Sequence, residues 1–338
     1  MEYRTLKFTN IPTVYTHTMS LLFSMFSNLD NIEDFAEEYE IPLNAKPIVD
    51  TLLVGLKRNI DVHYYDISPN IINVPKTNSV IVAFSGGKDS VATAIKLKDD
   101  GRDVRLFYVS GINKAYPDEM THAIQIAEQL DLPLHVAFVK QHGKTVFKES
   151  PVKNQIIASM ALDYAINNNL GCSIAFGDFT SDNIHNSQFF ESWSDTQEMW
   201  KSWLVFVRTF IPNVELIIPF KTYNETLDII SNKKKILELV CGCILPYRFR
   251  GMIRDNNEKK YGIKLLPNRC GSCWKCCTEY IYLVDEGKLQ QNKDFYDHCL
   301  NFLVRKLPSV RPEISPINKK TAYEAFLHRN FSCSIINK

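Results

Sequence analysis

The stretch Val80-Ile81-Val82-Ala83-Phe84-Ser85-Gly86-Gly87-Lys88-Asp89-Ser90 decides the fold. An apolar run of strand type leads into two glycines, and a helical pattern follows them. Glycine lets the backbone approach an anion closely, and the N–H groups and dipole of a first helical turn favour negative charge. Ser85, Lys88 and Ser90 add donors, while Asp89 is suited to hold Mg²⁺. The turn therefore predicts a phosphate-binding site.

Strand patterns alternate with helical patterns from residue 79 onward. Strands are expected at 79–84, 103–109, 133–139, 172–177 and 214–218. Helices are expected at 89–100, 117–130, 152–169 and near 195–210, with further helices from 223 to 241. This alternation indicates an α/β fold, a doubly wound parallel sheet with helices on both faces. Ligands of such sheets bind beyond the carboxyl ends of the strands, where the Ser85–Ser90 turn is expected.

Three parts are expected along the 338 residues. Residues 1–75, with a strand-like start at 3–8, form an N-terminal extension or small subdomain. Residues 76–235 form the nucleotide-binding domain, and residues 236–338 a cysteine-rich, zinc-binding and helical region. With 45% hydrophobic residues the chain can bury a large core. The absence of membrane-length apolar stretches and of a signal-peptide layout predicts a soluble, cytoplasmic protein without membrane association.

The charge is unevenly distributed although the formal net charge is only +1. From Lys233 to the end there are 20 Lys and Arg against 10 Asp and Glu, net +10, which leaves 19 against 28, net −9, in the preceding part. A basic C-terminal part is suited to face phosphate, nucleotide or nucleic acid. The alternative is a set of solvated charges that offset the acidic part.

Four of the nine cysteines are clustered in Cys270-Gly271-Ser272-Cys273-Trp274-Lys275-Cys276-Cys277. Two overlapping C-x-x-C steps let the thiolates of Cys270, Cys273 and Cys276 converge on one ion. The fourth ligand is expected from Cys241 or Cys243, and Cys277 stays open. All-cysteine coordination favours a structural Zn²⁺ site, with an iron–sulfur cluster or metal-free buried cysteines as alternatives.

Ser-Gly-Gly-x-Asp-Ser after a buried strand resembles the PP-loop of the ATP pyrophosphatase superfamily, and it lacks the spacing of a Walker A loop. Combined with the cysteine cluster, it resembles the 7-cyano-7-deazaguanine synthase family and its relatives. Two further segments resemble that family, Pro151–Ala161 and Ile174–Asp182, so the resemblance covers roughly residues 79 to 280.

The resemblance implies an ATP-dependent, AMP-forming carbon–nitrogen ligase. Such enzymes adenylate a carboxylate or amide on a deazapurine or related acceptor, after which an amine displaces AMP. ATP, Mg²⁺ and Zn²⁺ are the implied cofactors. Cys243 becomes the preferred fourth metal ligand, because the family's upstream cysteine precedes an apolar or aromatic residue, as Cys243 precedes Ile244. The implied catalytic residues are Lys88, Asp89, Ser90 and Asp182, and the implied nucleotide-binding residues are Ser85, Gly86, Gly87, Lys88, Asp89, Ser90, Asn154, Gly177 and Asp178.

Two other functions are compatible with the sequence. Lys88 stands where the synthases carry an uncharged residue and where other PP-loop enzymes, including tRNA-modifying ones, carry lysine, so a PP-loop tRNA-modifying enzyme is the first alternative. A nucleotide-binding component of a multi-protein assembly is the second. The expected partners are a small-molecule acceptor and an amine donor, with tRNA, protein partners and a homodimer left open.

Aromatic and histidine residues after the fourth strand offer further candidates. Phe189 or Trp193 would stack on a purine-like ring, or else belong to the core or an interface. His185 would shuttle a proton, or else be an ordinary loop residue.

Overall fold

The computed structural model describes residues 9–26, 32–111, 119–139, 150–180, 190–240, 242–243, 247–310 and 318–328. Its elements, in chain order, are α1 (Thr13–Phe26), α2 (Ile32–Glu38), β1 (Ile41–Pro42), the short 3₁₀ helix η2 (Leu43–Ala45), α3 (Lys46–Leu56), β2 (Tyr64–Tyr65), β3 (Ser79–Ala83), α4 (Lys88–Asp99), β4 (Asp103–Ser110), α5 (Glu119–Leu130), β5 (Leu134–Phe138), α6 (Lys153–Asn167), β6 (Ser173–Ala175), the 3₁₀ helix η5 (Phe190–Asp195), α7 (Gln197–Arg208), β7 (Glu215–Ile217), α8 (Tyr223–Ser231), α9 (Lys234–Leu239), α10 (Tyr247–Tyr261), α11 (Trp274–Asp285), α12 (Lys293–Val310) and α13 (Lys319–His328).

A five-stranded parallel sheet forms the centre, in the order β5-β4-β3-β6-β7. The predicted α/β fold is confirmed. The chain builds outward from β3 through β4 to β5, then returns to the other side of β3 and adds β6 and β7. The strand order therefore reverses between β3 and β6, and ligands of open α/β sheets bind at such a switch point.

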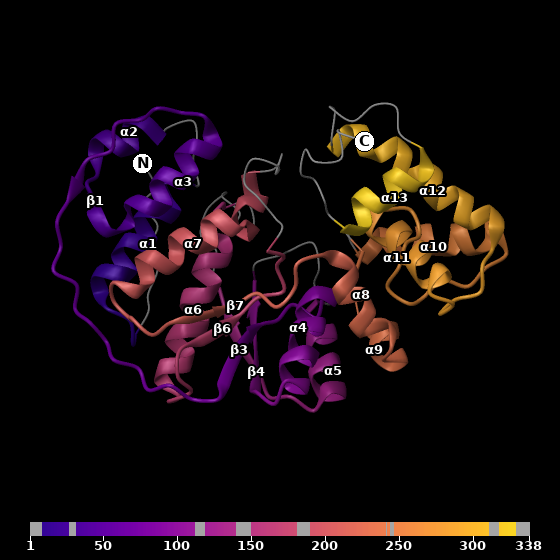
Figure 1. Cartoon of the computed structure of the whole chain (residues 1–338), viewed down its shortest axis with the longest axis horizontal. Helices are drawn as coiled ribbons and strands as arrows, with labels where there is room; N and C mark the ends of the chain where they lie inside the picture. The colour runs from indigo at the N-terminus through magenta and orange to yellow at the C-terminus, as the bar shows by residue number, and fades with distance from the viewer. Residues whose placement is uncertain are drawn as a thin grey trace.

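The two faces of the sheet carry different helices, because successive side chains of a strand point to opposite sides. Val80 and Val82 of β3 pack in one core cluster with residues of α4, α5, α8 and α9. Ile81 packs in the other with residues of α1, α6 and α7. Figure 1 shows α4, α5, α8 and α9 grouped together, with the first helices of the chain beside α6 and α7.

The N-terminal part is held to the sheet domain by a buried chain of hydrogen bonds. The Trp203 indole N–H donates to the Tyr15 hydroxyl over 3.0 Å, and the Tyr15 and Ser159 oxygens lie 2.6 Å apart. Ser159 donates in turn to the Gln155 carbonyl over 2.7 Å, so Tyr15 is the donor to Ser159. Burial raises the pKa of Tyr15 above its ordinary value. The strand-like start expected at 3–8 lies outside the described residues.

The C-terminal helices α11, α12 and α13 enclose a core of their own, and α11 and α13 also contact α8. The helices expected from 223 to 241 are α8 and α9. Asn232 ends α8 by donating its side-chain amide to the Asp228 carbonyl over 2.9 Å, and Lys233 takes a non-helical backbone with φ −120° and ψ 79°. Within the described stretches, no helix combines the length and apolar character needed to cross a bilayer.

We predict that Tyr15→Phe destabilises the protein. It leaves the Ser159 hydroxyl and the Trp203 N–H without their buried partner, which costs about 1–3 kcal/mol of the free energy of unfolding. Urea denaturation measures this. Tyr164→Phe is the matched control, because its ring contacts with Phe107 and His135 persist. Equal losses in the two variants would contradict the role given to the Tyr15 hydroxyl.

Candidate nucleotide site and cysteine cluster

The glycine-rich turn between β3 and α4 is shaped by its own two serines. The Ser85 N–H donates to Ser90 Oγ over 3.2 Å, and Ser90 Oγ donates to the Gly87 carbonyl over 3.0 Å. The Gly87 N–H donates to Ser85 Oγ over 3.2 Å. Gly86 has φ +70°, which disfavours any side chain there. The turn thus has a preformed shape at the start of α4, as an anion cradle requires.

Gly177 lets the end of β6 lie directly against the first turn of α4. A Cβ at Gly177 would come within 2.6 Å of the Asp89 carbonyl carbon and 2.7 Å of the Ser90 nitrogen. Any side chain would therefore separate the two elements. The structure brings Gly177 against Asp89 and Ser90, from which it is separated by 87 or more positions in the sequence, at the switch point of the sheet.

Lys88 is turned into the protein. Its side chain is 2% exposed, and its ammonium pairs with the Asp89 carboxylate and lies 3.5 Å from the centroid of the Tyr223 ring. Thr226 Oγ1 donates to Asp89 Oδ1 over 3.2 Å. Both contacts come from α8, and no local sequence signal identifies them. The expected roles of Lys88 in phosphate binding and of Asp89 in holding Mg²⁺ remain predictions.

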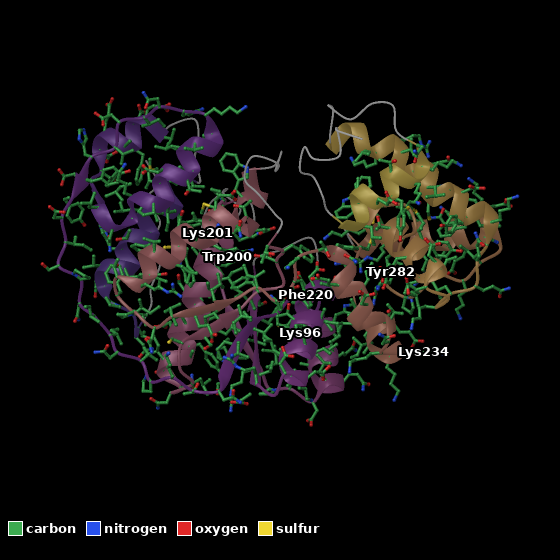
Figure 2. All side chains as sticks on the ribbon, in the orientation of Figure 1. Lys96, Trp200, Lys201, Phe220, Lys234 and Tyr282 are labelled. Carbon is green, nitrogen blue, oxygen red and sulfur yellow. The ribbon has the colours of Figure 1, made fainter. Side chains whose placement is uncertain are left out.

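A group of polar side chains from α6, from the segment after β6 and from η5 lies beside the turn. The Asn154 amide donates to Asp178 Oδ2 over 3.3 Å and to Asp195 Oδ1 over 2.7 Å. The Trp200 indole N–H donates to Asp178 Oδ2 over 2.9 Å, and Figure 2 shows Trp200 on α7 above the sheet. Asn154 and Asp178 were expected at the site, whereas Asp195 and Trp200 are found only through the fold.

Other sequence candidates fall elsewhere. Trp193 is 7% exposed and belongs to the core cluster that includes α6 and α7. It therefore packs as a core residue, which was the expected alternative to stacking on a purine-like ring. Asp182, His185, Phe189 and Cys241 lie outside the described residues.

Four buried thiols converge in the C-terminal part, those of Cys243, Cys270, Cys273 and Cys276. Their sulfur atoms all lie within 4.8 Å of one another. The Cys243–Cys273 distance is 3.9 Å and the Cys270–Cys276 distance is 3.8 Å. Four sulfurs bound tetrahedrally at about 2.3 Å lie about 3.8 Å apart, so the set fits one tetrahedral ion. A [4Fe–4S] cluster binds each thiolate to a different iron and spreads the sulfurs further.

The thiols of this cluster strongly influence one another. Hydrogen bonding with Cys243, followed by the other thiols and burial, raises the pKa of Cys276 well above its ordinary value, and that of Cys270 is raised as well. Cys277 is directed elsewhere, because its sulfur faces the Gly271 carbonyl at 3.7 Å and hydrogen-bonds with Cys299. Cys277 is therefore outside the converging set.

A buried ion pair fixes the cluster against the sheet domain. Arg269 donates to Glu279 through two nitrogens, over 2.7 Å and 2.6 Å, and also donates to the Val240 carbonyl. A Cβ at Gly242 would come within 3.3 Å of Glu279 Oε2 and 3.9 Å of Lys88 Cδ. Gly242 thus lies beside both the ion pair and Lys88, and the cysteine cluster adjoins the glycine-rich turn.

No protein-family model matches the chain, and no curated protein matches it. Among solved structures, 47 chains match. One is described as a predicted subunit of a tRNA methyltransferase from Methanocaldococcus jannaschii, with 22% identity and a TM-score of 0.27 over 45% of this chain and 74% of that one.

Two further matches have comparable values. The U34-tRNA thiolase NcsA from Methanococcus maripaludis, with its [4Fe-4S] cluster, has 21% identity and a TM-score of 0.34 over 64% of this chain and 73% of that one. The NMN synthetase from Francisella tularensis has 13% identity and a TM-score of 0.30 over 81% of this chain and 98% of that one.

We predict that Gly177→Ala damages the candidate nucleotide site. Its methyl group would overlap backbone atoms of Asp89 and Ser90, so α4 must shift, at a cost of about 1–3 kcal/mol. Thermal unfolding should show the loss of stability, and calorimetry a weaker affinity for ATP. Gly251→Ala in α10 is the matched control, because a Cβ there meets nothing within 4 Å. Wild-type stability and affinity in Gly177→Ala would show that the close approach is unimportant.

Proposed function

We propose that this protein is an ATP-dependent enzyme of the PP-loop type that releases AMP and pyrophosphate. The observation that carries the proposal is the meeting of the glycine-rich turn and Gly177 at the switch point between β3 and β6. The N–H groups at the start of α4 would bind the outer phosphates of ATP, because the helix dipole favours their negative charge there. Asp89 would supply a carboxylate oxygen to the accompanying Mg²⁺.

The proposed reaction activates an acceptor oxygen. An acceptor carboxylate oxygen attacks the α-phosphorus of ATP, the bond from that phosphorus to the bridging oxygen breaks, and pyrophosphate leaves. An amine then attacks the acyl carbon, and AMP departs with the former carboxylate oxygen while the amine loses a proton. No nucleophilic side chain is needed. The protein binds and orients the partners and stabilises charge on the leaving group.

The proposed acceptor is 7-carboxy-7-deazaguanine or a related deazapurine. A guanine-type ring presents two adjacent N–H donors on one edge, and carboxylates accept such donors in pairs. Asn154 brings together the carboxylates of Asp178 and Asp195 beside the glycine-rich turn. These contacts support the deazapurine, in addition to the resemblance of the loop and the cysteine spacing to the synthase family.

A tRNA-modifying enzyme is the second candidate, because a basic surface lies on the same domain. A cavity of about 440 Å³ between the ends of α4 and α5 and the start of α9 is lined by four lysines, one aspartate, one glutamine and three apolar residues. The lysines are Lys98, Lys233, Lys234 and Lys235. Figure 2 shows Lys234 at the outer edge of the molecule. Exposed lysines of this kind neutralise phosphates of a nucleic-acid backbone.

We predict that the purified protein, given ATP, 7-carboxy-7-deazaguanine and ammonia, releases AMP and pyrophosphate and forms the amide. A second ATP then adenylates the amide oxygen, and AMP leaves with that oxygen while the amide nitrogen loses two protons, which gives the nitrile. Mass spectrometry detects the products. Ser90→Ala should lower turnover by about 10²-fold or more, because Ser90 shapes the turn and contacts the departing pyrophosphate in the proposed mode.

The outcomes separate the candidates. AMP release that requires tRNA selects the tRNA-modifying enzyme. ATP binding without turnover on either acceptor favours the nucleotide-binding component of a protein assembly. ADP as the dominant product would contradict the PP-loop chemistry as a whole.

For the cysteine cluster we propose one Zn²⁺ held by Cys243, Cys270, Cys273 and Cys276. The spacing of the sulfurs and the all-thiolate donor set support zinc over a multi-iron cluster. When bound, Zn²⁺ would cross-link the segment before α10 to the start of α11. It would supply stability rather than a reacting group.

We predict one zinc per chain by elemental analysis. Cys243→Ser should lose most of the zinc and lower the solubility and the melting temperature, since an emptied thiolate site leaves the local fold without its cross-link. Cys277→Ser is the matched control, because its sulfur faces Gly271 and Cys299, and it should retain zinc. Stoichiometric iron with sulfide would overturn the zinc assignment.

A further inference from the structure

Two contacts lead from the cysteine cluster to Lys88 in the glycine-rich turn. The first is through the backbone before the upstream cysteine. Gly242 directly precedes Cys243, and a Cβ on Gly242 would come within 3.9 Å of Lys88 Cδ. The aliphatic part of the lysine is thus bounded by the backbone that carries one of the four thiols.

The second contact is aromatic. Trp274 directly follows Cys273 and opens α11. Its ring centroid lies 6.1 Å from that of Tyr223, and the Lys88 ammonium lies 3.5 Å from the centroid of the same Tyr223 ring. Tyr223 is fully buried, and a cation over a desolvated aromatic ring is strongly held. The Tyr223 ring therefore touches Lys88 and Trp274 at once.

We infer that Tyr223 and Trp274 are positioning residues, and that through them the metal occupancy of the cysteine cluster sets the affinity of the glycine-rich turn for ATP. Four thiolates bound to one ion fix the backbone at Cys243 and Cys273. Gly242 and Trp274 are then fixed as well, and they hold Lys88 and its partner Asp89 at the start of α4. The inference builds on the proposed function, since it takes ATP as the ligand of the turn.

Thermodynamic linkage makes the inference measurable from both sides. If the bound metal strengthens ATP binding by some factor, ATP strengthens metal binding by the same factor. A purely structural zinc site, whose only task is to stabilise α10 and α11, predicts a factor of one for folded protein. A core role for Tyr223 likewise predicts that changes of its ring alter stability but leave the metal and ATP independent of each other.

The primary experiment is calorimetry with a non-hydrolysable ATP analogue on zinc-loaded protein. Tyr223→Leu removes the ring and should weaken binding by about tenfold with zinc fully retained, whereas Tyr223→Phe keeps the ring face and should bind like wild type. Phe35→Leu is the matched control. Phe35 is a buried ring of α2 that stacks on Tyr39 at 4.5 Å, so its loss removes a core ring far from Lys88, Tyr223 and Trp274. Its affinity for the analogue should remain that of wild type.

The second experiment measures zinc affinity with a competing chelator, with and without the analogue. In wild type the analogue should strengthen zinc binding by about tenfold, and in Tyr223→Leu by less than about twofold. Two results would each overturn the inference and leave the proposed function intact. One is an unchanged affinity for the analogue in zinc-loaded Tyr223→Leu, and the other is a zinc affinity of the wild type that is the same with and without the analogue. Absence of analogue binding in zinc-loaded wild type overturns both.

Discussion

The close approach of Gly177 to the first turn of α4 is the contact on which the site depends. A parallel sheet whose strand order reverses leaves a crevice beyond the two strands that flank the reversal. Here those strands are β3 and β6, and the missing side chain of Gly177 allows backbone atoms at the end of β6 to meet Asp89 and Ser90. The polar group of Asn154, Asp178 and Asp195 is thereby placed beside the glycine-rich turn.

The buried ion pair of Arg269 and Glu279 plays the corresponding part for the C-terminal region. Burying two charges is costly unless the geometry is good and the remaining donors are used. The pair here is bidentate, and Arg269 also donates to the carbonyls of Val240 and Pro267. These bonds tie the end of α9 to the cysteine cluster and to α11. The pair therefore specifies how the cluster is seated against the sheet domain, and removing one partner would leave a buried charge.

Much of the fold could be predicted because strand and helix periods alternate cleanly after residue 79. The position of the boundary between α8 and α9 could not, since it depends on the Asn232 side chain, which donates to the Asp228 carbonyl at the end of α8. The N-terminal part gave no readable chemistry. Its attachment depends on the pairing of Tyr15 with Ser159 and Trp203, which are distant in the sequence and carry no motif.

At the site, the spacing of the cysteines and of the turn was informative because both are local. The inward direction of the Lys88 side chain could not be predicted, because a lysine in a first helical turn is expected to face an anion. Its partner Tyr223 lies 135 positions later in the sequence. The proximity of the cysteine cluster to the turn was hidden for the same reason. Gly242 and Trp274 reveal it only when the chain is folded.

The most direct measurement of the central claim is pyrophosphate exchange. Protein, ATP, Mg²⁺ and 7-carboxy-7-deazaguanine are incubated with radiolabelled pyrophosphate and without an amine, so that only reversible activation of the acceptor can occur. The account predicts label in ATP that depends on the acceptor, because an adenylate forms and returns AMP to pyrophosphate. No exchange with either the deazapurine or tRNA as acceptor, in protein that binds ATP, would contradict it.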